Sequence, residues 1–308
     1  MKLVDLHCDT VSAIFEKQES LFSNSGQYDI ERALQANLGW QFFALFTMPD
    51  DCNTVLRNVL KQVDKFHSEV ELNTQHLYHL KRYEDINKYE NHNKIGCLLH
   101  LEGGEAIGND LEMVSLLYRL GLRSMGLTWN HRNLLADGVA EGSSAGGLSV
   151  KGKRVVDEMN RLGIILDLAH ISETCFFDAL EYYDKPVLVS HANTRMLCDH
   201  RRNLTNDQLH ALADHKGVIG VTQVSDFVKE NGATLDDLIN HIAYIAELIG
   251  VEHVALGSDF DGADSMVIAD VKGYEVLPGC LRKRGFNPDE IEMILKDNAL
   301  RVMKQVLV

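Results

Sequence analysis

Two residues close to the start of the chain, His7 and Asp9, form the first candidate pair for metal chemistry. They follow the strand-like run at residues 3–6 and are separated by Cys8. Because successive side chains of a β-strand point to opposite faces, His7 and Asp9 point one way and Cys8 the other. An imidazole beside a carboxylate suits a divalent ion of the zinc type. A His-x-Asp match also arises by chance, so this interpretation depends on partners elsewhere in the chain.

The composition of the chain is that of a soluble globular protein and argues against several kinds of partner. Its 308 residues are 45% hydrophobic and 24% charged, which is ordinary. A net charge of −15 disfavours nucleic acid. Polar residues follow the first strand at once, and no apolar run approaches the ~20 residues of a membrane span. We therefore expect a cytoplasmic protein, with neither membrane nor nucleic acid among its partners.

Short apolar runs alternate with longer amphipathic stretches along the chain. The runs predict eight strands, at residues 2–7, 39–47, 95–102, 124–128, 163–168, 186–190, 217–221 and 251–258. The amphipathic stretches predict helices at residues 30–37, 54–72, 111–120, 150–162, 173–183, 206–215 and 234–249. Such alternation is typical of parallel strands joined by helical crossovers.

Eight strand–helix units in a chain of this length favour a (β/α)8 TIM barrel. A doubly wound open sheet is the competing fold, but no glycine-rich phosphate loop follows the first strand. No repeat or Pro/Gly-rich linker interrupts the pattern, so we expect one domain over residues 1–308. Residues 274–285 look irregular, and residues 288–308 look like closing helices.

Polar residues stand where five of the predicted strands end, and barrel active sites are built at strand ends. These residues are His7 and Asp9, Glu102, Asp167 and His170, Ser190 and His191, and Asp259 and Asp261. Three imidazoles with two or three carboxylates and no thiolate suit two zinc-class ions that share a bridging carboxylate. His100 lies one pleat deeper than Glu102, so we expect a hydrogen-bonded interior histidine, and we expect Asp261 to organise its own turn.

Five ordered motifs, LHCDT, LHLEGGEAIG, DLAHIS, SHANTR and GSDFDG, resemble those of the membrane (renal) dipeptidase family of binuclear zinc peptidases. The resemblance covers nearly the whole chain. It implies an amidohydrolase-like barrel that hydrolyses dipeptides, with two zinc ions as cofactors. By position, His7 and Asp9 would bind one zinc, His170 and His191 the second, and Glu102 both. Asp259 would be the general acid/base.

The same resemblance suggests which residues contact the substrate. The family has an arginine about eleven residues beyond its second-zinc histidine, and Arg202 matches that spacing. A guanidinium suits a terminal carboxylate, although neighbouring Arg201 is the alternative register. Where the mammalian pattern has Leu-Thr-His, this chain has Trp129 in place of the histidine. Asn130 or His131 would then serve instead.

We therefore predict a metallohydrolase that cleaves dipeptides, including those with a C-terminal D-residue, by attack of a metal-bridging hydroxide. The alternative is a binuclear-metal amidase, lactonase or phosphotriesterase on a non-peptide substrate, since one barrel can host many reactions. A third hypothesis is a catalytically silent barrel that senses a metal or peptide. The family resemblance also suggests a homodimer.

Overall fold

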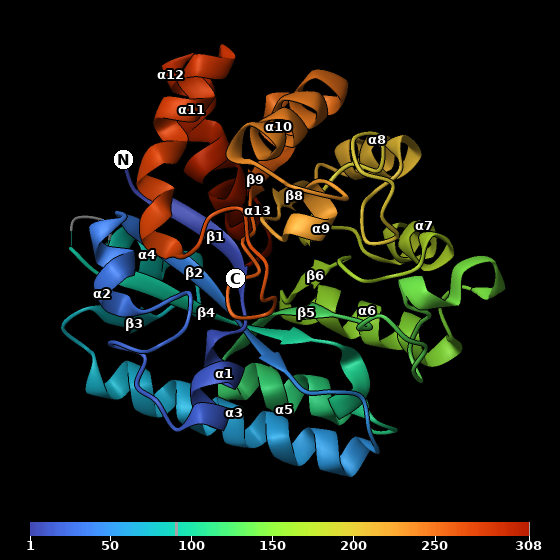
Figure 1. Ribbon diagram of the computed structural model, residues 1–308. Coiled ribbons are helices and arrows are strands. Elements are labelled where there is room, and N and C mark those ends of the chain that lie inside the picture. The colour runs from blue at the N-terminus through green and yellow to red at the C-terminus, as the bar shows by residue number, and fades with distance from the viewer. Residues whose placement is uncertain (90–91, 308) are drawn as a thin grey trace.

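The computed structural model describes residues 1–89 and 92–307, and it shows a barrel of parallel strands surrounded by helices (Figure 1). Eight strands are hydrogen-bonded in the order β1-β2-β4-β5-β6-β7-β8-β9, and β3 pairs with β4 outside this path. The predicted (β/α)8 fold is therefore confirmed. The strands are β1 (Leu3–Cys8), β2 (Leu38–Phe46), β3 (Leu77–His79), β4 (Ile95–Glu102), β5 (Leu122–Gly126), β6 (Ile165–Asp167), β7 (Leu188–Ala192), β8 (Val218–Val221) and β9 (Val254–Leu256).

Helices fill the crossovers and form the outer layer of the barrel. They are α1 (Thr10–Lys17), α2 (Ile30–Gln35), α3 (Cys52–Leu72), α4 (Tyr83–Tyr89), α5 (Glu112–Leu120), α6 (Val150–Leu162), α7 (Glu173–Tyr182), α8 (Asn206–Asp214), α9 (Ser225–Val228), α10 (Leu235–Ile249), α11 (Leu277–Arg284), α12 (Pro288–Glu292) and α13 (Asn298–Val306). Among the described residues, no helix combines the length and the apolar character needed to cross a membrane.

Successive side chains of β4 point to opposite faces of the strand and pack in two different apolar clusters. Cys97, Leu99 and Leu101 belong to the large apolar cluster that also contains the buried faces of α3 and α5. Leu98 belongs instead to a second cluster, and Glu102 reaches the donor groups described below. A strand covered on both faces must be apolar on both, except where its end meets a site.

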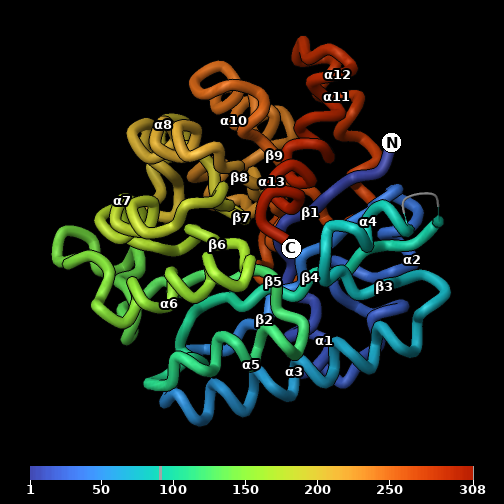
Figure 2. The backbone as a smooth tube through the Cα atoms, turned by 180° about the vertical axis from the view of Figure 1, so that it is seen from behind, coloured from blue at the N-terminus to red at the C-terminus, as the bar shows by residue number. Residues whose placement is uncertain are grey.

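The two ends of the barrel differ in chemistry. The second apolar cluster gathers residues near the starts of several strands, including Val4, Leu98 and Val218, against Val302 and Met303 of α13. This last helix lies across the centre of the barrel when the chain is seen from behind (Figure 2). Apolar packing thus closes the amino-terminal end of the strands, and the polar side chains remain at the carboxyl-terminal end.

The barrel is joined between its first and last strands by a buried carboxylate. Asp5 on β1 accepts hydrogen bonds from the backbone N–H of Ser258 (2.7 Å) and from its hydroxyl (2.6 Å). Two backbone hydrogen bonds follow along the same seam, from Asp259 to His7 (3.2 Å) and from Asp9 to Phe260 (2.8 Å). These contacts bring the segment after β9 beside the end of β1.

The structure corrects the sequence prediction in two ways. Strand β3 and helices α1, α4 and α9 were not expected, because segments of three to eight residues are short for a periodic signal. The prediction of irregular structure over residues 274–285 was wrong, since α11 occupies most of it. Pro278 lies in the first turn of α11, where proline is tolerated, and Leu277 and Leu281 are buried. The closing helices are confirmed, apart from Val308, which lies outside the described residues.

Replacing Asp5 by alanine tests the seam. The substitution leaves the buried backbone N–H of Ser258 without its acceptor, while the hydroxyl keeps only the carbonyl of His7 (2.8 Å), so the free energy of unfolding should fall by about 2 kcal/mol. Urea denaturation followed by circular dichroism measures this change. Asp157→Ala, at an exposed carboxylate on α6, is the control and should change it by less than about 0.5 kcal/mol. Equal changes in the free energy of unfolding for the two substitutions would show that the hydrogen bonds of Asp5 do not stabilise the barrel.

Candidate metal centre

The end of β1 contributes an imidazole and a carboxylate to one buried group. His7 Nε2 lies 3.1 Å from Asp9 Oδ2, and Asp9 immediately follows the strand as the residue that precedes α1. Glu102, the last residue of β4, places its Oε2 3.6 Å from the same nitrogen. All three residues are buried. Three donor atoms from two strands thus meet at one point of the barrel mouth.

The other carboxylate oxygen of Glu102 faces a second group. Glu102 Oε1 lies 2.8 Å from His170 Nε2 and 3.8 Å from His191 Nε2. The two imidazole nitrogens are 2.8 Å apart. His170 follows β6, and His191 lies within β7. Glu102 therefore stands between two sets of donors, which is the geometry that a bridging carboxylate requires.

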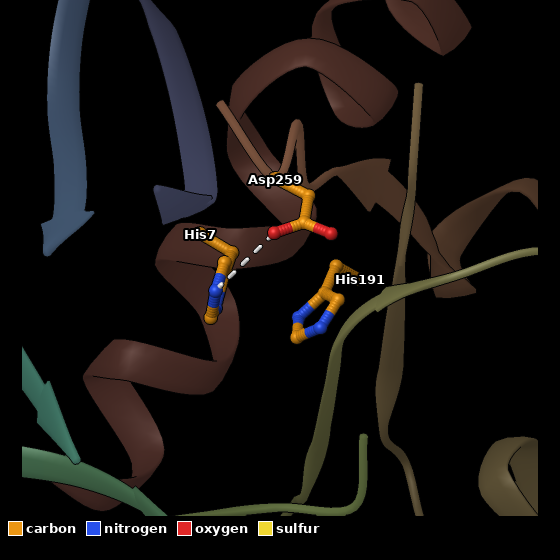
Figure 3. Close-up of side chains that lie close together, drawn as sticks. All are labelled: His7, His191 and Asp259. Atoms are coloured by element: carbon orange, nitrogen blue, oxygen red, sulfur yellow. Dashed lines mark ion pairs between the residues drawn. The ribbon is translucent and has the colours of Figure 1, made fainter. Parts of the chain in front are cut away.

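Asp259 completes the cluster from the segment after β9. Its Oδ1 lies 3.8 Å from His7 Nε2, the ion pair drawn in Figure 3, where the ring of His191 stands close to both. Among the described residues, three sets of donor atoms lie within 4.8 Å of one another and could hold a metal ion. They are His7/Asp9/Glu102, Glu102/His170/His191 and His7/His191/Asp259.

The backbone is strained where two of these side chains are placed. His170 has φ +65° and Asp259 has φ +68°, in the left-handed region that residues other than glycine rarely adopt. Gly262 is required by space and not by its backbone angles. A Cβ at this position would clash with Asp259 Oδ1 and Asp9 Oδ2. The loop after β9 can approach the cluster only with glycine at this position.

Burial dominates the electrostatics of the cluster. It raises the pKa of Glu102 well above its usual range and that of Asp259 to about 7, and the charge of Asp9 adds to both shifts. Burial alone would lower the pKa of His7, but Glu102 and Asp9 outweigh it and raise that pKa to about 10. Desolvated carboxylates that crowd one another need a cation among them.

The donor chemistry of the cluster fits a divalent metal. Burial, helped by the positive charges of Arg202 and His7, lowers the pKa of both His170 and His191 well below the usual range. Both rings are therefore neutral, as metal ligands must be. Asp9 Oδ1 is buried, and among the described residues it has no hydrogen-bond partner. Neutral imidazoles, crowded carboxylates and an unpartnered carboxylate oxygen together favour nitrogen and oxygen ligation of the zinc type.

Arg202 lines a small cavity together with the acidic residues of the cluster. The cavity measures about 160 Å³, and Asp9, Glu102, Asp259 and His170 also line it. Arg202 is buried, donates from Nη2 to the carbonyl of His191 (3.1 Å), and lies 5.6 Å from the Phe227 ring. Burial lowers its pKa to about 10, against the opposing charges of Asp259 and Glu102, so the guanidinium stays positive at neutral pH.

Arg201 points to a different part of the molecule. It lines a larger cavity of about 870 Å³, between Glu173 and Asp178 of α7 and the loop that carries Arg195 and Asp199. None of the predicted metal ligands lines that cavity. Of the two registers left open by the sequence, only Arg202 stands beside the cluster.

The three residues after β5 have different positions. Trp129 forms an apolar wall of the small cavity, with its ring 5.4 Å from Phe46 and 6.1 Å from His170. Asn130 also lines the cavity, and its Oδ1 accepts a hydrogen bond from His170 Nδ1 (2.9 Å). His131 is exposed and is absent from the cavity lining, with its ring 5.9 Å from that of Trp129.

Two further residues lie where the sequence indicated. His100 is buried, with Nδ1 3.0 Å from the Ser124 hydroxyl, and it belongs to none of the three donor sets. Asp261 accepts hydrogen bonds from the hydroxyl of Thr10 (2.6 Å) and the backbone N–H of Gln27 (2.6 Å). Its carboxylate therefore ties the loop after β9 to the segments after β1, whereas the sequence predicted that it organises its own turn.

Sequence reasoning missed the apolar walls of the cavity, which are Phe46, Val224 and Phe227. Phe46 ends β2 as Glu102 ends β4, so its position at a strand end was an available signal. Phe227 lies in the four-residue helix α9, which has no sequence signal of its own.

Known proteins match this chain over nearly its whole length. Residues 1–307 match the family model described as "Membrane dipeptidase (Peptidase family M19)". The dipeptidase aclJ of Aspergillus oryzae is 32% identical, over 91% of this chain and 70% of that protein.

Solved structures agree with these matches. A metallo peptidase from Rhodobacter sphaeroides, liganded with a phosphinate mimic of the dipeptide L-Ala-D-Ala, is 25% identical. It superposes with a TM-score of 0.93 over 99% of both chains. The metallo peptidase dipeptidase AC is 26% identical, with a TM-score of 0.92 over 100% of this chain and 99% of that chain.

Replacing Glu102 by glutamine tests whether one carboxylate serves both donor groups. The amide removes the charge and puts an N–H₂ group where a ligand oxygen stood, so zinc affinity should fall by more than about 100-fold. Competition against a chelating dye measures this affinity, and elemental analysis counts the ions. Glu105→Gln is the matched control, because Glu105 is a partly buried carboxylate that bonds Asn133 (3.0 Å) and belongs to no donor set. Undiminished zinc binding by Glu102→Gln would contradict the shared role.

Proposed function

This chain belongs to the membrane dipeptidase family (peptidase family M19) and is a metallohydrolase of the dipeptidase type; from that premise we propose that it is a zinc enzyme that cleaves dipeptides, including those with a C-terminal D-residue. The observation that carries the proposal is the position of Glu102, with one carboxylate oxygen toward each of two donor groups. The positive Arg202 beside this cluster supports a substrate with a free carboxylate.

We propose that His7 and Asp9 hold one zinc ion, that His170 and His191 hold the second, and that Glu102 holds both. The donor distances and the neutral state of His170 and His191 support this division. Two bound zinc ions would supply an activated hydroxide nucleophile between them and would polarise the carbonyl of the scissile peptide bond.

Asp259 is the proposed general acid/base. Its carboxyl is buried and borders the cavity, and its pKa of about 7 lets it both accept and donate a proton near neutral pH. In the proposed reaction Asp259 takes the proton of the attacking water and gives it to the leaving amine. Phe46, Trp129 and Phe227 surround this path with apolar surface, which excludes bulk water from the proton.

Arg202 is the proposed anchor for the C-terminal carboxylate of the substrate. A guanidinium and a carboxylate form two parallel charge-assisted hydrogen bonds, and burial strengthens them. Trp129 and Asn130 would complete the substrate site, whereas exposed His131 is the weakest of the three proposed contacts. A cavity of about 160 Å³ suits a small dipeptide. The Rhodobacter sphaeroides relative, solved with a mimic of L-Ala-D-Ala, supports acceptance of a D-residue.

We further propose that residues 1–308 act as one domain. The continuous order of strands from β1 to β9 and the seam at Asp5 support this, because both ends of the chain contribute to one barrel.

Replacing Arg202 by methionine separates a dipeptidase from a hydrolase of uncharged esters. Zinc-loaded protein should cleave L-Ala-D-Ala and L-Ala-L-Ala, and metal-stripped protein should not. Arg202→Met should lower kcat/KM for both by about 10²- to 10⁴-fold, because two charged hydrogen bonds are lost. Arg201→Met, at the neighbouring arginine outside the small cavity, should leave kcat/KM nearly unchanged.

Lactone and phosphotriester substrates complete that experiment. A dipeptidase should turn them over poorly in every variant. Rapid hydrolysis of an uncharged ester that Arg202→Met leaves intact would instead favour the non-peptide alternative.

Replacing Asp259 by asparagine tests proton transfer. The amide keeps the size of the side chain but cannot take up the proton, so kcat should fall by about 10²- to 10⁴-fold. Zinc content and KM should change little, since Asp259 is proposed to move a proton and not to hold an ion. Steady-state kinetics together with elemental analysis check both parts. Loss of zinc from this variant would assign Asp259 to the ligands instead, as its proximity to His7 and His191 permits.

A further inference from the structure

A buried chain of side chains lies behind His191, on the side away from the cluster. His191 Nδ1 is 2.8 Å from the hydroxyl of Ser190, and that hydroxyl donates to Asp167 Oδ2 (2.5 Å). Ser190 and His191 are each 1% exposed, and Asp167 is 2% exposed. Neither Asp167 nor Ser190 lines the small cavity, so neither reaches a substrate there.

The hydrogen bonds fix the direction of every proton in this chain. Asp167 Oδ1 accepts from the backbone N–H of Ala169 (3.0 Å) and of Ser190 (2.8 Å). Its Oδ2 accepts the single proton of the Ser190 hydroxyl. The hydroxyl oxygen of Ser190 can then only accept from His191, which places the imidazole proton on Nδ1. The lone pair of His191 is left on Nε2, the nitrogen that faces His170 and Glu102.

We propose that Asp167 and Ser190 are positioning residues that hold His191 in the Nδ1–H tautomer and so build one of the two metal sites. The inference rests on the proposed ligand set, because it concerns the ion assigned to His170 and His191. A partner behind a metal-binding histidine fixes its ring and tautomer and raises its basicity as a ligand.

The chain of hydrogen bonds from His191 through Ser190 to Asp167, called the relay below, supports one side of the cluster only. Among the described residues, Asp167 and Ser190 make no side-chain hydrogen bond to His7, Asp9 or Glu102. The site at His7 also has two carboxylates, from Asp9 and Glu102, whereas the other depends on two imidazoles and Glu102. Losing the relay should therefore weaken one ion and spare the other.

Two substitutions distinguish a relay from simple packing. Ser190→Ala removes the acceptor for His191 Nδ1–H. Asp167→Asn hardly changes the size of the side chain, but it reverses the direction in which the hydrogen bonds along the chain are donated. The amide oxygen would keep the two backbone N–H groups, and the amide nitrogen would donate to Ser190, whose hydroxyl must then donate to His191 Nδ1. The ring is driven to the Nε2–H tautomer, which has no lone pair for the ion.

Ser124→Ala is the matched control. Ser124 is another buried serine at a barrel strand, and its hydroxyl bonds another buried histidine, His100 Nδ1 (3.0 Å). His100 belongs to no donor set, although its Nε2 lies 3.4 Å from Asp167 Oδ2. A general loosening of the barrel interior would affect Ser124→Ala as much as Ser190→Ala.

The experiment titrates metal-free protein with zinc against a chelating dye and counts the ions retained after gel filtration. Wild type and Ser124→Ala should each bind two zinc ions, and the affinity for each ion should be the same in both proteins. Ser190→Ala should bind one of them about 10- to 100-fold more weakly, and Asp167→Asn should weaken the same ion at least as much. Melting temperatures of the metal-free proteins, followed by circular dichroism, check that all variants fold.

Each other outcome has a definite meaning. Wild-type affinity for both ions in Ser190→Ala and Asp167→Asn would overturn the relay, as would equal losses in Ser124→Ala. A harmless Asp167→Asn beside a harmful Ser190→Ala would also overturn it, because packing alone predicts that order. If Ser190→Ala fails to fold, the nearly isosteric Asp167→Asn decides the question. Wild-type protein that binds no zinc would contradict the proposed function itself, not the relay.

Discussion

The burial of three carboxylates against one another is the constraint on which the rest of this structure depends. Asp9, Glu102 and Asp259 come from three different parts of the chain and meet in a desolvated barrel mouth, where burial raises the pKa of Glu102 and Asp259. Such an arrangement is unfavourable unless positive charge joins it. Neutral imidazoles at His170 and His191 and the buried guanidinium of Arg202 surround these carboxylates. The site therefore combines the charge that attracts divalent ions with the lone pairs that hold them.

The barrel stabilises this unfavourable cluster by a division between its two ends, with apolar packing at one and polar contacts at the other. Apolar residues near the strand starts pack against α13, so the amino-terminal end contributes burial without polar groups. At the opposite end the buried hydrogen bonds that Ser258 donates to Asp5 join the segment after the last strand to the first strand, which places Asp259 beside His7. Strained backbone at His170 and Asp259 is tolerated only because this packing holds it.

A second layer of polar residues orients the first. Ser190 and Asp167 lie behind His191, Asn130 lies behind His170, and each accepts or relays the proton on Nδ1. The ring nitrogens that face Glu102 are thereby left as acceptors. The DLAHIS and SHANTR motifs thus each contain one residue that faces the cluster, His170 or His191, and one that supports the cluster from behind, Asp167 or Ser190. A description limited to the donor atoms would omit what determines their orientation.

The sequence by itself determined the barrel, the order of its eight main strands and the polar strand ends, because periodicity and strand-end position are local properties of the chain. It also placed His7, Asp9, Glu102, His170, His191 and Asp259 at one rim, since parallel strands all end on the same side. Only the tertiary structure decided which arginine enters the cavity, which aromatic residues form its walls, and that Asp167 and Ser190 support His191. Those facts depend on loop paths and on contacts between residues far apart in sequence, and the helix at residues 277–284 was misjudged for the same reason. Local pattern predicts where a side chain leaves its strand, but the packing of the whole barrel decides what that side chain meets.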